Sequence, residues 1–337
     1  MTHRFPQSAT VVAAAVVVTS AAFVPIQACA WGSTGHRIIT RVALRALPSR
    51  MPAFLTLPET QTIAIDLAPE LDRLKGAGES FDADSNPGHY LRLGDDGRIA
   101  GILLLASMPA TMEAFADKLQ TVSTNPWKTG YLPYAIADGW QRLRQDFAYM
   151  RVYEYLVARA KGPTRATFAL ERSLIEKIII ADIGLWGHYV GDASQPLHTS
   201  VHYNDDDMNI PFETDFVRAH VSPDAVQKLV PTGAPAQATA LISQRDLLAQ
   251  IGAYITATNR HTAMVYEIGK RGGFSQVTPE ALDFTNARLA DGARELRDLV
   301  VQAYDNSLYA KIGTPAVSVQ DVLNGRVVPT QSTLRAN

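Results

Sequence analysis

Apolar residues recur every three or four positions along most of the chain, as expected for helices that bury one face. This spacing predicts helices over residues 37–47, 143–160, 167–191, 237–270 and 279–309. The 167–191 segment is apolar on most of its faces, so we expect a central, buried helix there. No run alternates between apolar and polar residues for long enough to predict a β-sheet. The pattern therefore predicts an all-α fold.

Segments rich in Asp, Gly and Pro interrupt these helices, and we expect loops at about 58–99, 121–140 and 195–212. Loops carry function more often than helices do, so candidate ligands in these segments are of interest. The last segment, 314–337, is polar and is expected to be a loose tail. Residues 31–313 are therefore predicted to form the folded domain.

The first thirty residues are typical of a secretory signal peptide. Arg4 is followed by an apolar stretch at 9–24 and then by the small residues of an Ala-x-Ala cleavage site ending at Ala30. Cleavage there makes Trp31 the new N-terminus and implies export to the periplasm or the medium. A lipoprotein site at Cys29 and a buried N-terminal helix are the alternatives. No other segment has the long apolar run that a membrane span needs.

Charge and cysteine content restrict the choice of partner and of stabilising bonds. The chain has 31 basic and 33 acidic residues, whereas proteins that grip long nucleic acids electrostatically are usually basic. Any contact with nucleic acid is therefore expected to be short-range. The single cysteine, Cys29, is removed with the signal peptide, so we expect the mature protein to depend on its core and on metal rather than on disulfides.

His188 and Asp192 are the strongest candidates for chemistry. They are four residues apart in a predicted helix, so their side chains project from the same face. Pro196 ends the helical pattern, and His198 follows on a loop that can turn back. Zinc accepts imidazole nitrogen and carboxylate oxygen readily. A buried hydrogen bond between His188 and Asp192 is the alternative interpretation.

Two longer motifs contain these residues and favour the metal. The stretch 31–37 reads Trp-Gly-Ser-Thr-Gly-His-Arg, and 188–198 reads His-Tyr-Val-Gly-Asp-Ala-Ser-Gln-Pro-Leu-His. Together they resemble the superfamily of zinc-dependent phospholipases C and three-zinc, single-strand-specific nucleases, and they are most similar to the nuclease branch. The resemblance implies a compact helical domain with a cluster of two or three zinc ions in a cleft.

Matching single positions to the family's motifs implies a set of zinc ligands. These are Trp31, His36, Asp72, His89, His188, Asp192, His198 and Glu213. Trp31 would bind through its free amine and its carbonyl group, and Asp192 would bridge two ions. Asp66 competes with Asp72 for the position of the family's early aspartate.

The third zinc position departs from the family's pattern. Where the family has a histidine four residues before the carboxylate that matches Glu213, this chain has Asn209. An amide is a poor zinc ligand, so His202 is the alternative donor. A weaker site, a site rebuilt by His202 and an empty site all stay open.

The resemblance implies hydrolysis of phosphoester bonds by a hydroxide held between two ions. Asp72 would orient the nucleophile, Lys75 or Arg73 would neutralise charge on the phosphate, and Tyr90 would stack a nucleobase. We expect a nuclease or 3′-nucleotidase that acts as a monomer on single-stranded nucleic acid or nucleotides. A phospholipase C is the alternative, which Glu213 and the slightly acidic charge favour. A non-catalytic zinc-binding protein is the third possibility.

Overall fold

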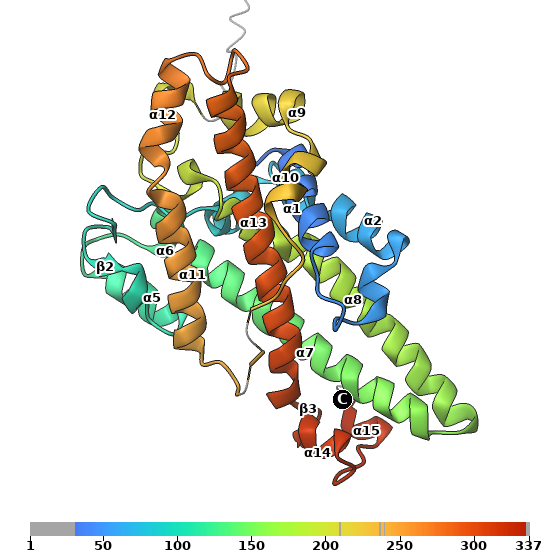
Figure 1. The fold of residues 1–337 in the computed structure, drawn as a ribbon. Helices are drawn as coiled ribbons and strands as arrows, with labels where there is room; N and C mark the ends of the chain where they lie inside the picture. Colours follow the sequence, from blue (N-terminus) through green and yellow to red (C-terminus); the bar gives the residue numbers. More distant parts are fainter. Residues whose placement is uncertain (1–30, 209, 236, 239, 335–337) are drawn as a thin grey trace, which may run out of the picture.

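The computed structural model describes residues 31–208, 210–235, 237–238 and 240–334 (Figure 1). The predicted signal peptide, including Cys29, lies outside these residues. Helices account for 69% of the structure and strands for 3%, so the all-α prediction is confirmed. In the described part of the chain, no helix is both long and apolar enough to cross a membrane.

The larger helices form the body of the molecule. They are α1 (Ser33–Arg45), α2 (Pro58–Leu67), α5 (Met112–Gln120), α7 (Leu132–Arg159), α8 (Gly162–Asp192), α11 (Gln244–Asn259), α12 (Thr262–Lys270) and α13 (Pro279–Asn306). Short helical turns and two small antiparallel hairpins complete the fold. The hairpins pair β1 (Arg98–Ile99) with β2 (Leu103–Leu104), and β3 (Lys311–Ile312) with β4 (Val317–Ser318).

Helices α7 and α8 form a long pair that extends toward one end of the molecule (Figure 1). Gly139 lets them approach closely, because a Cβ atom there would lie 1.9 Å from Cδ1 of Trp186. The indole of Trp186 donates its Nε1–H to the carbonyl oxygen of Ile136 at 2.8 Å. This contact fixes the position of the C-terminal half of α8, which ends at Asp192.

Three other helices surround the C-terminal half of α8. Helix α1 packs along α13, and both also contact α8. Helix α2 crosses α8 at Gly184, where a Cβ atom would lie 2.7 Å from the carbonyl oxygen of Ala64. The N-terminal residues of the described chain and the end of α8 are thereby brought together.

Several boundaries differ from the predicted ones. Helix α7 begins at Leu132, because Pro133 occupies its first turn, where a missing N–H costs nothing. The helix predicted over 237–270 is divided into α11 and α12. At the division Asn259 donates its side-chain N–H to the carbonyl oxygen of Thr199 at 2.7 Å, and Thr262 donates its hydroxyl to that of Pro196 at 3.3 Å. Contacts between distant segments do not appear in the local spacing of apolar residues, so the sequence pattern did not predict this division.

The segment expected to be a loose tail is packed as far as residue 334. Helix α14 (Val319–Leu323) lies against the end of α7 that is far from Leu132, and β4 pairs with β3, which also contacts α7. The side chains of Val319, Val322 and Leu334 are buried in a second, smaller apolar core with Val152 and its neighbours. The partly buried Val317 and Leu323 pack against the same core, so a few apolar residues spaced along a polar segment hold it to the body of the protein.

Candidate metal centre

Five structural elements bring histidine and aspartate side chains together at the C-terminal end of α8. The residues are His36 of α1, Asp72 of α3 (Glu70–Arg73), His89 of η2 (Asn86–His89), His188 and Asp192 of α8, and His198 of η4 (Pro196–Thr199). Pro87 and Pro196 lie in the first turns of η2 and η4, where proline is well tolerated. The histidines and Asp192 are buried, and the side chain of Asp72 is 14% exposed.

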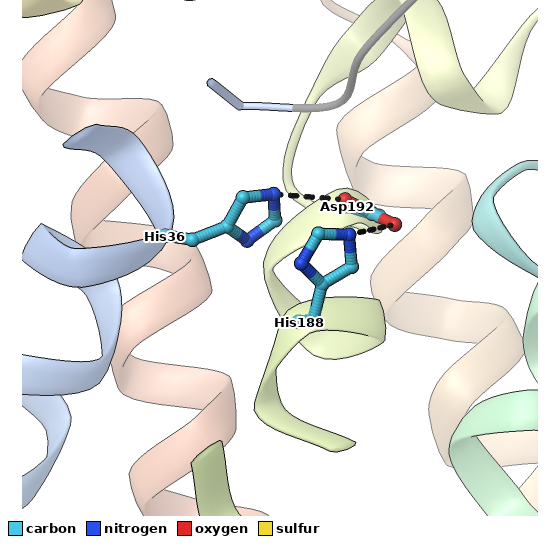
Figure 2. Close-up of side chains that lie close together, drawn as sticks. All are labelled: His36, His188 and Asp192. Atoms are coloured by element: carbon cyan, nitrogen blue, oxygen red, sulfur yellow. Dashed lines mark ion pairs between the residues drawn. The ribbon is translucent and has the colours of Figure 1, made fainter. Parts of the chain in front are cut away.

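The carboxylate of Asp192 faces the rings of both His36 and His188 (Figure 2). Its Oδ1 is 3.3 Å from Nε2 of His36. Its Oδ2 is 2.9 Å from Nδ1 of His89 and 3.5 Å from Nε2 of His188. His188 and Asp192 do lie on the same face of α8, one turn apart, as their spacing predicts. The two oxygens face different imidazoles, which is the arrangement needed for a carboxylate that bridges two ions.

Asp72 also lies close to His36 and His188. Its Oδ1 is 3.5 Å from Nε2 of His188, and its Oδ2 is 3.9 Å from Nε2 of His36. The rings of His36 and His188 are stacked with their centroids 3.7 Å apart. Two overlapping groups, His36–His188–Asp192 and Asp72–His89–His188, have ligand atoms within 4.8 Å of one another and could each hold a metal ion.

Backbone carbonyl groups orient two of the rings. The carbonyl oxygen of Ala68 lies 2.8 Å from Nδ1 of His188, and that of His89 lies 2.8 Å from Nδ1 of His198. A carbonyl oxygen can only accept, so each Nδ1 carries a hydrogen. In the neutral rings Nε2 then has a lone pair, which is directed into the cluster. Histidines that bind metals are commonly held by such second contacts.

The charges of the cluster explain the pKa shifts of its members. Burial opposes the ionisation of Asp192, but His188, His36 and His89 hold the pKa of its carboxyl well below the usual range. Burial lowers the pKa of His36 and brings that of His89 to about 4, so both rings are neutral at pH 7. Burial also disfavours the charged form of His188, but Asp192 and Asp72 raise its pKa. The cluster therefore attracts positive charge, which a proton or a metal ion can supply.

Several buried polar atoms of the cluster lack a hydrogen-bond partner, which indicates whether a cation would fit there. Among the described residues, Nε2 of His36, Oδ1 of Asp192, Nε2 of His198 and Oε1 of Glu213 are buried without a hydrogen-bond partner. Buried polar atoms are rarely left in this state, because an unpaired group costs about 1–3 kcal/mol. All four atoms can accept a cation, so the donor set fits a metal centre.

Glu213 and His198 form a further pair beside the main cluster. Oε2 of Glu213 lies 3.8 Å from Nε2 of His198, and both side chains are buried. Glu213 belongs to a single π-helical turn, η6 (Pro211–Phe216), a rare conformation that is common at functional sites. Asn209, which the sequence places at the same site, lies outside the described residues.

His202 does not join this pair. Its Nδ1 lies 2.6 Å from Oδ2 of Asp205, and its Nε2 lies 3.0 Å from Oδ1 of Asp95, in a group with exposed side chains. Both ring nitrogens already face carboxylates. The suggestion that His202 completes the third zinc position is therefore not supported by its place in the structure.

Trp31 is fully buried at the start of α1, next to the turn that follows Asp192. Its indole Nε1–H donates to the hydroxyl oxygen of Ser194 at 2.7 Å, and its ring meets the edge of Phe212 at a centroid distance of 5.1 Å. A Cβ atom on Gly35 would lie 2.7 Å from that of Trp31, so only glycine fits there. The indole thus anchors the segment that precedes α1. Whether Trp31 has a free amine that binds metal stays a prediction.

Arg73 and Asp66, the alternatives to Lys75 and Asp72, form ion pairs outside the cluster. Arg73 is 79% exposed and forms an ion pair with Glu70 at 2.6 Å, so the structure does not bring it to the cluster. Asp66 is 66% exposed and faces Arg37 at 3.5 Å. By contrast, Nζ of Lys75 lies 2.5 Å from Oδ1 of Asp72.

A cleft of about 660 Å³ opens beside the cluster, with Lys75, His89 and His198 in its lining. Aromatic and basic side chains form much of the rest, among them Tyr90, Arg92, Trp127, Lys128 and Tyr203. The guanidinium carbon of Arg92 is 4.4 Å from the ring centroid of Tyr203 and 5.0 Å from that of Tyr90. Of these five residues, the sequence analysis selected only Tyr90. The other four lie in or beside the predicted loops, but no spacing rule connects them.

No protein-family model matches the chain, and neither does any characterised sequence or solved structure. The arrangement of side chains is therefore the basis for a functional proposal.

Proposed function

We propose that this protein is a zinc-dependent phosphodiesterase that cleaves single-stranded nucleic acid. The observation that carries the proposal is the buried cluster around Asp192, which has unpartnered acceptor atoms and whose members His89 and His198 line a cleft with basic and aromatic walls. A non-catalytic zinc-binding protein needs only the cluster. A nucleic-acid phosphodiesterase also needs a cleft for the charged phosphates and planar bases of its substrate.

Zinc is the ion that suits these donors. It accepts imidazole nitrogen and carboxylate oxygen with small coordination numbers, whereas magnesium and calcium prefer oxygen alone. The two groups share His188, whose single free nitrogen can bind only one ion, so Asp72, His89 and His188 would hold one ion, and His36 with the other oxygen of Asp192 would contribute to a second. Bound zinc would lower the pKa of a water molecule and offset the charge of a phosphate group.

Asp72 and Lys75 are suited to handle a proton and a phosphate charge. Burial opposes the ionisation of Asp72, but the charges of His188 and Lys75 keep the pKa of its carboxyl below the ordinary value. Asp72 is therefore an anion at neutral pH and can accept a hydrogen bond from a nucleophile. The ammonium group of Lys75 belongs to both the Asp72 pair and the cleft lining, so it can attract a phosphate oxygen to this position.

The cleft walls favour nucleic acid as the substrate. Trp127 and Tyr203 line the cleft and have 47% and 39% of their surface exposed, so a base in the cleft could contact both side chains. Stacking of a base on an aromatic ring contributes about 1–3 kcal/mol and works for any base. Arg92 and Lys128 can contact phosphate groups along the strand.

A phospholipase C is the second candidate. In the superfamily that the sequence resembles, the position of Glu213 is a glutamate in phospholipases and an aspartate in nucleases. A side-by-side assay of purified mature protein on single-stranded DNA, RNA and phosphatidylcholine tests the proposal, with Asp192→Asn as the inactive control. We expect the nucleic acids to be cleaved. Faster release of phosphocholine would favour the phospholipase, and zinc binding without hydrolysis of any of the three would contradict an enzymatic function.

A further inference from the structure

Gln195 is a buried polar residue in the turn between α8 and η4. Its side-chain Oε1 accepts a hydrogen bond from the backbone N–H of Leu197 at 2.5 Å. This contact determines which end of the amide is the oxygen. The Nε2 group therefore faces Oε2 of Glu213, to which it donates at 2.7 Å.

The Gln195 amide holds a carboxylate that faces another acceptor. Oε2 of Glu213 lies 3.8 Å from Nε2 of His198, whose lone pair points outward from the ring because Nδ1 donates to a backbone carbonyl group. The other oxygen of Glu213, Oε1, is buried without a hydrogen-bond partner in the part of the chain that the structure describes. Two facing acceptors repel each other unless a cation lies between or beside them.

Gln195 is well suited to keep this pair in place. It adds no charge of its own, so it does not compete with a cation for the Glu213 carboxylate. Its backbone lies between the two ligand-bearing elements, because Asp192 ends α8 and His198 belongs to η4. The backbone of Glu213 is held separately, since its carbonyl oxygen accepts from the N–H of Gly32 at 3.3 Å.

We infer that Gln195 is a positioning residue: it aims the carboxylate of Glu213 at the ring of His198 and thereby sets the zinc affinity of that pair. The inference rests on the proposed function, because it assumes that zinc is the cation. It separates this pair from the Asp192 cluster by the part of Gln195 that is used: the side-chain amide donates to Glu213, whereas the backbone N–H donates to the carbonyl oxygen of Asp192 at 3.0 Å and is kept in any variant of the side chain. The ion at Glu213 should then respond to Gln195 while the ions at Asp192 do not.

The experiment measures zinc retained by the mature protein after dialysis against chelators of graded strength. The variant is Gln195→Leu. The matched control is Gln141→Leu on α7, which removes another amide hydrogen bond, the one that Gln141 donates to Gln244 of α11 at 2.7 Å. We expect Gln195→Leu to weaken binding of the most weakly held zinc about tenfold, as loss of such outer contacts typically does. The tightly held zinc should be unchanged, and the control should retain every ion as the parent protein does.

A double-variant comparison distinguishes positioning from general loosening of the site. If Gln195 acts only through Glu213, then Glu213→Ala and the double variant Glu213→Ala with Gln195→Leu should retain the same zinc. A further loss in the double variant, or an unchanged weakest ion in Gln195→Leu, would overturn the inference. Gln195→Asn, which keeps the amide but shortens its reach, gives the same comparison if the leucine variant does not fold. A parent protein that binds no zinc at all would instead overturn the proposed function.

Discussion

The carboxylate oxygen Oδ1 of Asp192 lies 3.3 Å from Nε2 of His36, although the two residues belong to different helices, α8 and α1. The other oxygen of Asp192 faces His89 and His188. The carboxylate of Asp192 thus contacts imidazoles on two sides of the cluster. It also supplies a negative charge, which the neutral imidazoles do not have.

Asp192→Asn should therefore damage the site more than His198→Ala. The asparagine variant loses the charge and places an amide where an oxygen faced two rings, so we expect at least a hundredfold loss of hydrolysis and loss of tightly held zinc. His198 pairs with Glu213 at 3.8 Å and contributes to a separate position, so its loss should leave measurable activity. Initial rates and zinc content of both variants are the measurements, and equal residual rates would show that the ligands are wrongly assigned.

Metal should also support the fold, because the proposed ligands come from separated elements and Cys29 is the only cysteine in the sequence. An ion that binds only the folded state at a hundred times its Kd stabilises it by about 2.7 kcal/mol. Two such ions correspond to a Tm shift of roughly 10 °C for a protein of this size class. Calorimetry before and after chelation should show this fall, and added zinc should restore the parent Tm. An unchanged Tm after verified removal of metal would count against the cluster.

The predicted cleavage after Ala30 can be tested on exported protein. Intact-mass analysis should find Trp31 as the first residue, and its free amine should then raise zinc affinity because an α-amino group with a pKa near 8 deprotonates readily. A variant with one additional alanine before Trp31 should hold less zinc and keep the buried indole in place. A lipid on Cys29, or equal zinc retention in the extended variant, would contradict the role of the amine.

Local patterns predicted the parts of the structure that local forces decide. The four-residue spacing of His188 and Asp192 placed them on the same face of α8. The prediction that 167–191 is buried is correct only for the C-terminal half of that helix, because Leu170, Leu174 and Ile178 in its first half are exposed. Lys75 could not be preferred over Arg73 from the sequence, because the choice depends on which side of the short α3 turn faces the cluster. The structure shows Lys75 against Asp72 and Arg73 in solvent.

The sequence did not predict features that depend on contacts between distant segments, because no local pattern encodes such contacts. Gln195 belongs to a recognised motif, but nothing in the sequence connects it with Glu213, which lies in a π-helical turn. The break between α11 and α12 follows from a hydrogen bond of Asn259 to the η4 turn. Each of these contacts joins segments that only the folded chain brings together.

The aromatic cleft predicts a specific defect in substrate binding. Tyr203→Ala removes a ring that lies 4.4 Å from Arg92 in the cleft wall, so we expect KM for single-stranded DNA to rise about tenfold with little change in kcat. Tyr155→Ala is a matched control, since Tyr155 also stacks with an arginine, Arg159 at 3.6 Å, but lies near the far end of α7. Steady-state kinetics decide the matter. Equal KM values in the two variants would remove Tyr203 from the binding site.

Glu295 on α13 predicts how stability depends on pH. Burial, assisted by the charge of Asp298, raises the pKa of its carboxyl from 4.5 to about 7, and its Oε1 atom is buried without a hydrogen-bond partner among the described residues. In the folded state the neutral form is therefore favoured. As the pH rises through 4.5, the group ionises in the unfolded chain but not yet in the folded one, so stability falls until the pH exceeds about 7.

Glu295→Gln cannot ionise and should lack this loss. The difference between the two pKa values corresponds to roughly 3 kcal/mol, so the variant should exceed the parent in free energy of unfolding by on the order of 2–3 kcal/mol at pH 8.5. At pH 4 the carboxyl is largely protonated in both states, and the two proteins should be nearly equal. Glu280→Gln, on the same helix but paired with Arg271 at the surface, is the control. Urea unfolding at both pH values with zinc held constant measures the effect, and a difference that is the same at pH 4 and pH 8.5 would show that ionisation of Glu295 is not its cause.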